Sequence, residues 1–364
     1  MHRSLELAAR ARGRTSPNPL VGAVLVREGR VVGEGFHAQA GSPHAEAEAL
    51  RAAGFRAAGA TLYINLEPCA HQGRTPPCAA ALVDAGVARV VSSLEDPDPR
   101  VAGRGHRFLR DAGVQVQEGF LADEAVRLNE EYLHRARTGR AFGVLKAAVT
   151  LDGRLGPEDG NSRWITGEES RRRAHEMRDQ YDAVLVGRGT LERDDPGLDV
   201  RIPGSRRNPV AVVVDSKLSV PPDRSLWERA KCGEQVLMAT TDSADKAAES
   251  RLVDCGVTVL RLPADPEGRV DMGSLFRALG GRGINSVMVE GGMELHTAVL
   301  RAGLIGRAHL FVAPLILGGS RGPRLVGDLG IGSVAEALRL REITHETLGS
   351  DVLITGRILP EETG

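Results

Sequence analysis

Short hydrophobic runs alternate with amphipathic segments along this chain. In the first 140 residues, residues 27–29 join two strands in a hairpin, and Gly139 fits a helix stop. The alternation predicts a sheet flanked by helices. The predicted strands span residues 21–26, 30–33, 61–67, 89–95 and 114–119, and the predicted helices span 3–13, 44–54, 78–86, 106–113 and 123–137.

A second set of strands follows residue 140, starting with FGVLKAAVTLDGRL, and helical patterns lie between most of its members. No internal repeat relates the two parts. A chain of 364 residues exceeds the size at which one hydrophobic core stops growing, about 250–300 residues. We therefore predict two α/β domains, residues 1–140 and 141–364. Further strands of the second domain are predicted at 182–187, 209–215, 235–240, 257–262 and 286–292.

Composition narrows the function classes. Hydrophobic residues make up 41% and charged residues 26% of the chain, which is typical of a globular protein. The start, MHRSLELAARARG, is typical of an amphipathic helix, so we expect no signal peptide, and no run of about 18 apolar residues predicts a membrane span. Four cysteines without a secretory signal favour the cytoplasm. A net charge of −1 favours small-molecule substrates over nucleic acid.

The segment LEPCAHQGRTPPC, residues 66–78, holds two of the four cysteines. Their eight-residue gap matches neither a redox CxxC nor a zinc knuckle, so the pair alone is ambiguous. The upstream segment PHAE adds His44, at the start of a predicted helix. Cys78 opens another predicted helix, where the positive helix end is expected to lower the thiol pKa. His44, Cys69 and Cys78 together fit a zinc site whose fourth position is open for water.

Glu46 is the candidate proton shuttle of this site. Zinc lowers the pKa of bound water to about 7, and attack of the hydroxide on an amidine carbon still requires a group that carries a proton to the departing ammonia. Zinc-dependent deaminases carry H-x-E followed by P-C-x-x-C, and the glutamate and the Pro-Cys element match here. Taken one at a time, these residues fit a solvated helix start and inert buried thiols. Cys232 and Cys255 have no histidine or acid in register, and we expect them to be structural or exposed.

With SPNP, PHAE and LEPCAHQGRTPPC, the N-terminal half closely resembles the deaminase domain of the bifunctional riboflavin biosynthesis deaminase/reductases, a family in which the eight-residue cysteine gap is the rule. The resemblance implies a cytidine-deaminase-like three-layer α/β/α fold, with His44, Cys69 and Cys78 as zinc ligands and Glu46 as the shuttle. Many relatives have lysine at position 74, and a guanidinium also suits a phosphate. The implied substrate contacts are Asn18, His37, His71 and Arg74.

The C-terminal half resembles the reductase domain of the same family, which has a dihydrofolate-reductase-like α/β fold. The motifs VLKAAVTLDGRL, SRWITG, DAVLVGRGTLERDDPGLDVR, VVVDSKL, VEGG and APLILGG follow in the family's order, although Thr150 stands where serine is more common. The implied NADPH contacts are Ala148, Trp164, Thr166, Thr190, Asp194, Ser216 and Gly292. The implied substrate contacts are Lys146, Ser162, Arg178, Leu198, Arg201 and Glu290.

The residues alone say less about this second half. No GxGxxG follows a strand, so a Rossmann site is not indicated. The segment SVMVEGGMELHTAVL predicts a strand, two glycines and a helix whose first amides can bind a pyrophosphate. The reductase assignment therefore depends mainly on the resemblance.

The resemblance implies a cytoplasmic enzyme of riboflavin biosynthesis with Zn²⁺ and NADPH as cofactors. It would deaminate 2,5-diamino-6-ribosylamino-4(3H)-pyrimidinone 5′-phosphate and then reduce the ribosyl side chain to ribityl. We expect phosphorylated pyrimidines as substrates, a homo-oligomer, and neither nucleic-acid nor membrane partners. One alternative is a nucleoside or tRNA deaminase with an unrelated C-terminal domain, which the near-neutral charge and the HQGRTPP segment oppose. The other is a non-catalytic zinc-binding module, which has no use for Glu46.

Overall fold

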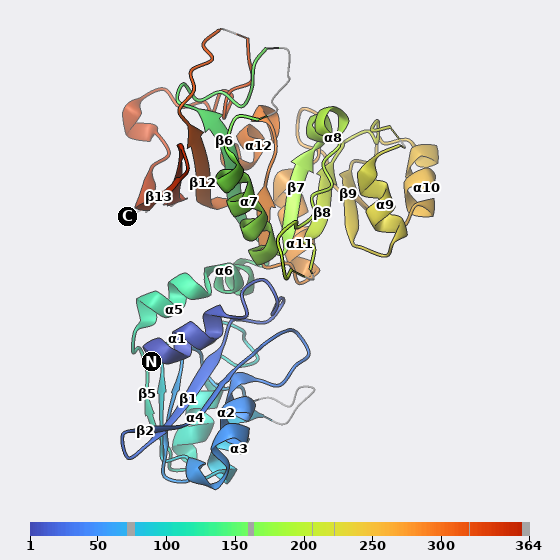
Figure 1. Ribbon diagram of the computed structural model, residues 1–364. Coiled ribbons are helices and arrows are strands. Elements are labelled where there is room, and N and C mark those ends of the chain that lie inside the picture. The colour runs from blue at the N-terminus through green and yellow to red at the C-terminus, as the bar shows by residue number, and fades with distance from the viewer. Residues whose placement is uncertain (71–76, 159–163, 206, 222, 320, 359–364) are drawn as a thin grey trace. The chain divides into compact units, whose positions relative to one another are not determined.

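The chain forms two compact units, Met1–Gly139 and Arg140–Gly364, each with its own sheet (Figure 1). The computed structural model describes residues 1–70, 77–158, 164–205, 207–221, 223–319 and 321–358. Within these residues, no helix combines the length and the apolar character that a membrane crossing requires.

The first unit is built on a five-stranded sheet of order β2-β1-β3-β4-β5. β1 pairs antiparallel with β2 and β3, whereas β3, β4 and β5 run parallel. The strands are β1 (Gly22–Arg27), β2 (Arg30–Phe36), β3 (Thr61–Ile64), β4 (Arg89–Ser92) and β5 (Gln115–Gln117). The helices are α1 (His2–Ala9), α2 (Ala45–Ala53), α3 (Cys78–Asp84), α4 (Arg104–Asp111), α5 (Ala122–Leu128) and α6 (Glu130–Thr138), with a 3₁₀ turn η1 (Gly54–Ala57).

Glycines in the first two strands bring helices directly onto the sheet. A Cβ on Gly22 would lie 2.1 Å from the carbonyl oxygen of Ser4 in α1, and one on Gly35 would lie 2.4 Å from that of Ala45 in α2. Gly35 pairs with Ala23, the neighbour of Gly22, so the two glycines face opposite sides of the sheet. α1 and α2 therefore cover opposite faces, which agrees with the three-layer fold.

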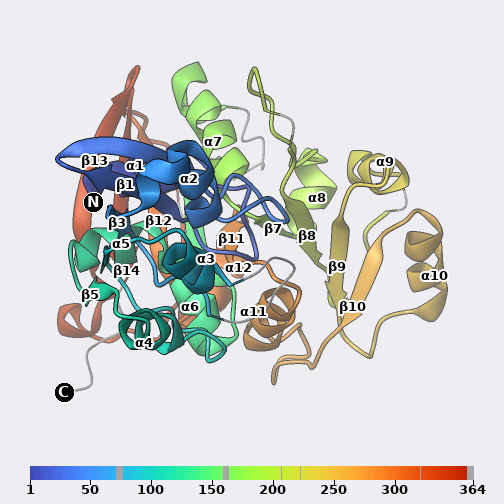
Figure 2. The ribbon, with the colours of Figure 1, turned by 90° about the horizontal axis from the view of Figure 1, so that it is seen from below.

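The second unit contains a nine-stranded sheet of order β10-β9-β8-β7-β11-β6-β12-β14-β13, and Figure 2 shows β7 to β10 side by side. All neighbours are parallel except β12–β14 and β14–β13. The strands are β6 (Phe142–Thr150), β7 (Ala183–Gly187), β8 (Val210–Val214), β9 (Val236–Thr240), β10 (Thr258–Arg261), β11 (Ser286–Val289), β12 (Ile305–Ala313), β13 (Leu340–Leu348) and β14 (Asp351–Ile358). The helices are α7 (Glu168–Gln180), α8 (Arg188–Asp194), α9 (Ser225–Lys231), α10 (Lys246–Asp254), α11 (Met272–Gly281) and α12 (Met293–Arg301), with a 3₁₀ turn η2 (Val334–Glu336).

The α/β class of both units is confirmed, and individual elements differ from the expectations. The helix expected over 123–137 is divided into α5 and α6 at Asn129. The side chain of Asn129 accepts the Leu20 N–H at 2.8 Å and donates to the Leu20 carbonyl at 2.9 Å, so a long-range contact fixes the break. The strand expected over 286–292 ends at Val289, and the strands β12, β13 and β14 were not predicted.

Candidate active sites

The first candidate site lies where three elements of the first unit meet. His44 is the N-cap of α2, Cys78 is the first residue of α3, and Cys69 lies in the loop after β3. Their ligand atoms, one nitrogen and two sulfurs, all lie within 4.8 Å of one another. The fold thus brings together three residues that are 25 and 34 positions apart in the chain.

The geometry of this trio fits zinc. His44 Nδ1 is 3.7 Å from Cys69 Sγ and 3.3 Å from Cys78 Sγ. In a tetrahedral zinc site, bonds of about 2.3 Å to sulfur and 2.0–2.1 Å to nitrogen place two such ligand atoms about 3.5 Å apart. The observed distances lie on either side of this value, and one imidazole with two thiolates is a donor set that zinc favours.

The helix start acts on Cys69, and the expectation that it lowers the pKa of Cys78 is wrong. The N–H of Cys78 donates to Cys69 Sγ at 3.4 Å, and the N–H of Ala79 donates to the Cys69 carbonyl at 3.1 Å. The hydrogen bond from the Cys78 thiol lowers the pKa of the Cys69 thiol to about 4, against the effect of its burial. Donation to Cys69, together with burial, raises the pKa of Cys78. The Cys78 thiol and, with a smaller effect, the Cys78 N–H at the start of α3 both donate to Cys69 Sγ, so the pKa of Cys69 is the one that is lowered.

Glu46 lies in the first turn of α2, two residues after His44, and its side chain is buried. Burial raises the pKa of Glu46 to about 7, and the negative charge of Cys69 acts in the same direction. A carboxyl group with a pKa near the working pH can both accept and return a proton. The position and the pKa of Glu46 are therefore suited to proton transfer beside the three candidate metal ligands.

Asn18 and His37 adjoin the same trio. Asn18 Nδ2 and His37 Nε2 are 3.0 Å apart, and His37 Nδ1 is 3.1 Å from the Pro43 carbonyl oxygen. The His37 ring meets the His44 ring edge-on, with centroids 5.6 Å apart. Burial lowers the pKa of His37, so a neutral ring donates from Nδ1 and accepts from Asn18. The expected contacts His71 and Arg74 lie outside the described residues.

The second candidate site centres on a buried carboxylate in the second unit. Glu290 follows β11, Lys146 lies on β6 and Arg178 on α7. Glu290 Oε1 accepts from Arg178 Nε at 2.6 Å, and its Oε2 accepts from Arg178 Nη2 at 2.9 Å and from Lys146 Nζ at 3.3 Å. Burial alone would raise the pKa of Glu290, but the charges of Arg178 and Lys146 outweigh it and hold the pKa well below its usual value.

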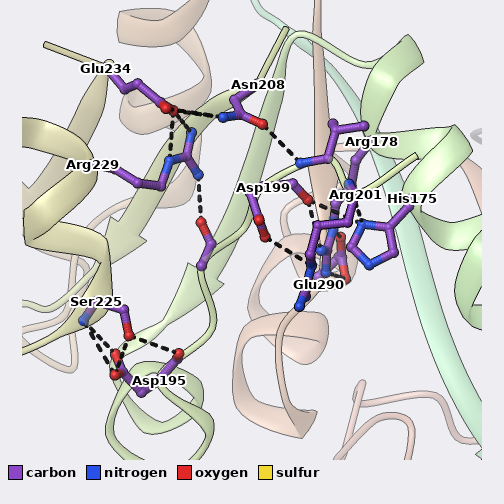
Figure 3. A network of polar contacts seen from close by, with 12 residues as sticks. His175, Arg178, Asp195, Asp199, Arg201, Asn208, Ser225, Arg229, Glu234 and Glu290 are labelled. Atoms are coloured by element: carbon purple, nitrogen blue, oxygen red, sulfur yellow. Dashed lines mark hydrogen bonds and ion pairs between the residues drawn. The ribbon is translucent and has the colours of Figure 1, made fainter. Parts of the chain in front are cut away.

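The loop after α8 meets this ion-pair cluster. The Asp199 carbonyl accepts from Arg178 Nη1 at 3.2 Å and lies 3.2 Å from His175 Nδ1 (Figure 3). Arg201, an expected substrate contact, lies beside the cluster in the same view and pairs with Asp199 Oδ1 at 3.3 Å. Arg229 anchors the loop by donating to the Gly197 carbonyl at 2.6 Å. Arg178, Arg201 and Glu290 are thus brought together, as binding of one ligand requires.

Leu198, an expected substrate contact, follows α8 in the same loop as Asp199. Its side chain is buried in the core and its φ is +48°. Only the backbone of Leu198 remains for a contact with substrate. Ser162, the other expected contact from a loop, lies outside the described residues.

Trp164 is exposed and held on one ring face. The Arg171 guanidinium lies 4.5 Å from its ring centroid, and Arg171 Nη1 donates to the Thr166 carbonyl at 2.8 Å. Trp164 is 69% exposed, which is unusual for a large aromatic side chain. Its exposed area suits stacking on a flat ligand ring, and Arg171 is a supporting residue that the motif did not indicate.

The remaining expected cofactor contacts lie on or next to strands and helices of the second unit. Gly292 is the N-cap of α12, and Arg193 Nη2 lies 3.8 Å from the position that a Cβ on Gly292 would occupy. This guanidinium adds positive charge beside the amides of α12. The sequence did not indicate this role for Arg193, because a single arginine on a polar helix is common. Thr190 and Asp194 belong to α8, Ala148 to β6, and Ser216 Oγ accepts the Val270 N–H at 3.1 Å.

Comparisons with known proteins match both units. The cytidine and deoxycytidylate deaminase zinc-binding region matches residues 1–94, and the RibD C-terminal domain matches residues 141–354. The riboflavin biosynthesis protein RibD of Bacillus amyloliquefaciens is 39% identical over 355 residues, 98% of this chain and 94% of that protein.

Two solved structures are similar over nearly the whole chain. Acinetobacter baumannii RibD is 36% identical with a TM-score of 0.89, covering 99% of this chain and 98% of the other. A diaminohydroxyphosphoribosylaminopyrimidine deaminase/5-amino-6-(5-phosphoribosylamino)uracil reductase from Thermotoga maritima is 34% identical with a TM-score of 0.85, covering 99% and 97%.

Proposed function

This chain belongs to the RibD family of riboflavin biosynthesis proteins, and from that premise we propose which of its residues carry out the two reactions. It is a bifunctional enzyme, a zinc-dependent deaminase and an NADPH-dependent reductase. A match over the full length leaves no support for an unrelated C-terminal domain or for a non-catalytic zinc module. The proposed domain bounds are residues 1–140 for the deaminase and 141–364 for the reductase.

The deaminase reaction is assigned to the site in the first unit. His44, Cys69 and Cys78 would hold the zinc ion, which would supply a water molecule of lowered pKa. Glu46 accepts a proton as water attacks C2 of the diaminopyrimidinone ring and delivers it to the leaving amine. The buried position of Glu46 and its pKa of about 7, two residues from a metal ligand, are the observation that carries this assignment.

The deaminase substrate is 2,5-diamino-6-ribosylamino-4(3H)-pyrimidinone 5′-phosphate. Asn18 orients the pyrimidine. The neutral His37 ring is hydrogen-bonded to Asn18 and fixes the orientation of its amide. His71 and Arg74, which belong to the segment between the two cysteines, bind the substrate phosphate. A guanidinium offers that phosphate two parallel hydrogen bonds.

The reductase reaction is assigned to the site around Glu290. NADPH, when bound, would supply the hydride for reduction of the ribosyl C1′ of the deaminated intermediate to ribityl. Lys146 and Arg178, fixed by Glu290, orient the sugar, and Arg201 faces its phosphate. The other proposed substrate contacts are Ser162 and the backbone of Leu198. The proposed cofactor contacts are Ala148, Trp164, Thr166, Thr190, Asp194, Ser216 and Gly292.

A coupled assay tests both assignments. We expect the purified protein to release ammonia without NADPH and to oxidise NADPH only after that release. Removal of zinc with a chelator should stop ammonia release but leave NADPH oxidation intact when the deaminated intermediate is supplied. Ammonia release that survives complete removal of zinc would contradict the proposed deaminase site.

We also propose that the enzyme is a cytoplasmic homo-oligomer that contacts its second copy through the C-terminal strands. The edge strand β13 exposes Ile343. Other exposed apolar side chains lie in the preceding segment, Val334 and Leu338, and on the paired strand β14, Val352. Grouped exposed apolar side chains are typical of protein–protein contacts. Light scattering of the wild type and of Ile343→Asp tests this, and a wild-type monomer would refute it.

A further inference from the structure

Glu67 joins the loop that carries Cys69 to a second part of the deaminase unit. Its buried carboxylate accepts four backbone N–H groups. Oε2 accepts from Asp96 at 3.2 Å and from Gly103 at 2.9 Å. Oε1 accepts from Gly105 at 2.7 Å and from His106 at 3.2 Å. No step of the proposed reaction uses this carboxylate.

The position of Glu67 follows from the sheet. β3 and β4 are parallel neighbours, so the loop after β3 and the loop from β4 to α4 leave the same edge. The N-cap of α4 is Gly103, which has a φ of +74° and no side chain to cap the helix. The first amides of a helix have no partner within it. Glu67 supplies that partner, and its negative charge suits the positive end of α4.

A close backbone contact reinforces this link. A Cβ on Gly105 would lie 1.9 Å from the Pro68 carbonyl oxygen, so α4 rests directly on the peptide that precedes Cys69. Even alanine at position 105 would displace Pro68 or tilt α4. Two independent features, a carboxylate and a missing side chain, therefore fix the same peptide against α4.

Cys69 is held on its other side by α3. The Cys78 N–H donates to Cys69 Sγ, and the Ala79 N–H donates to the Cys69 carbonyl. Cys69 thus lies between the starts of two helices.

We propose that Glu67 is a positioning residue of the metal centre, which holds Cys69 in ligand geometry by anchoring Pro68 to the start of α4. This inference rests on the proposed ligands His44, Cys69 and Cys78. Outer groups that orient metal ligands are worth about 10- to 100-fold in metal affinity. Glu67 acts through the backbone of Cys69 and does not touch zinc or substrate.

The test measures zinc affinity by competition with a chromogenic chelator, and ligand geometry by the visible spectrum of the Co²⁺-substituted protein. Glu67→Gln keeps the shape but turns an amide N–H₂ toward backbone donors. We expect its zinc affinity to fall about 10- to 100-fold, with an altered Co²⁺ spectrum. Gly105→Ala moves Pro68 while keeping the carboxylate, and it should have the same two effects even if Glu67→Gln does not fold.

Controls separate the possible failures. Asn129→Ala removes buried hydrogen bonds from the same unit, but those bonds go to Leu20. It should lower the melting temperature and leave zinc affinity within about 2-fold, because it spares the ligands. Wild-type zinc affinity in folded Glu67→Gln, or an equal loss in Asn129→Ala, would overturn the proposal. If Glu67→Gln does not fold, wild-type zinc affinity in Gly105→Ala would overturn it. Full zinc content in Cys69→Ser would instead show that the ligand set itself is wrong.

Discussion

Replacement of Glu290 by glutamine tests the energetics of the reductase site. The carboxylate makes three charge-assisted contacts, at 2.6 and 2.9 Å to Arg178 and at 3.3 Å to Lys146. The side chains of Arg178 and Glu290 are only 13% and 9% exposed, so solvent screens their attraction weakly. Glutamine keeps the shape and one acceptor oxygen but leaves two cations without a counter-charge.

The expected cost follows from the contacts. Removal of one partner from a buried ion pair costs about 3–5 kcal/mol. For a unit of roughly 150–250 residues, each kcal/mol shifts the melting temperature by about 2–4 °C, so we expect a decrease of about 6–20 °C. The reductase reaction should be lost as well, because Lys146 and Arg178 lose the group that orients them.

Calorimetry of the full chain measures this cost, and the transition of the deaminase unit serves as an internal control. Arg178→Met supplies the matched partner variant. The double variant Arg178→Met/Glu290→Gln should be less destabilised than the sum of the single variants, since it removes the uncompensated charge on Arg178.

The pH dependence gives a second readout of the same pair. The folded-state pKa of Glu290 lies below its unfolded value. Its stabilisation is therefore fully present above about pH 4.3 and is lost as the pH falls through the folded pKa. Wild type and Glu290→Gln should converge in stability in acid. A cost below about 1 kcal/mol at pH 7, or strictly additive effects, would refute the account of a buried pair.

Three further variants probe other parts of the molecule. Burial lowers the pKa of His309 to about 3, below the unfolded value of about 6.5, so the folded state loses about 2 kcal/mol of stability by pH 5 as the pH falls from 6.5 toward 3. Thermal melts of His309→Gln should show a smaller loss of stability between pH 7 and pH 5 than those of the wild type. An equal loss in both proteins would contradict this prediction. Gly35→Val places a Cβ 2.4 Å from the Ala45 carbonyl oxygen and should displace the start of α2. Zinc content and ammonia release should therefore fall while NADPH oxidation persists. Normal zinc content in this variant would contradict the close packing of α2 on β2. Trp164→Ala should raise the KM for NADPH about 10-fold, from the loss of about 1.4 kcal/mol of ring stacking, and leave ammonia release unchanged; an unaltered KM would exclude stacking on Trp164.

The sequence was sufficient for features that depend on local pattern. The alternation of strands and helices predicted the α/β class. The order of PHAE and LEPCAHQGRTPPC placed three candidate metal ligands near element ends that the fold brings together. Buried strands such as β7 and β8 are continuous apolar runs and could be recognised directly.

Features fixed by contacts between distant segments could not be predicted. β13 has seven consecutive exposed residues and no alternation to mark it as a strand. The break at Asn129 depends on Leu20, and the lowered pKa of Cys69 depends mainly on a hydrogen bond from the thiol of Cys78. Glu67 resembles any other acid after a strand until its four amide partners are known.

The central claim is that one chain holds two chemically independent sites, and the variant Glu46→Ala tests it most directly. Ammonia release from the diaminopyrimidinone phosphate and NADPH oxidation with the deaminated intermediate should be followed separately, with zinc content measured on the same samples. Glu48→Ala, a change on the same helix in a residue that pairs with Arg51, is the matched control. We expect Glu46→Ala to keep its zinc and its NADPH oxidation and to release no ammonia, and Glu48→Ala to keep all three. Ammonia release by zinc-loaded Glu46→Ala, or loss of NADPH oxidation in that variant, would contradict the claim.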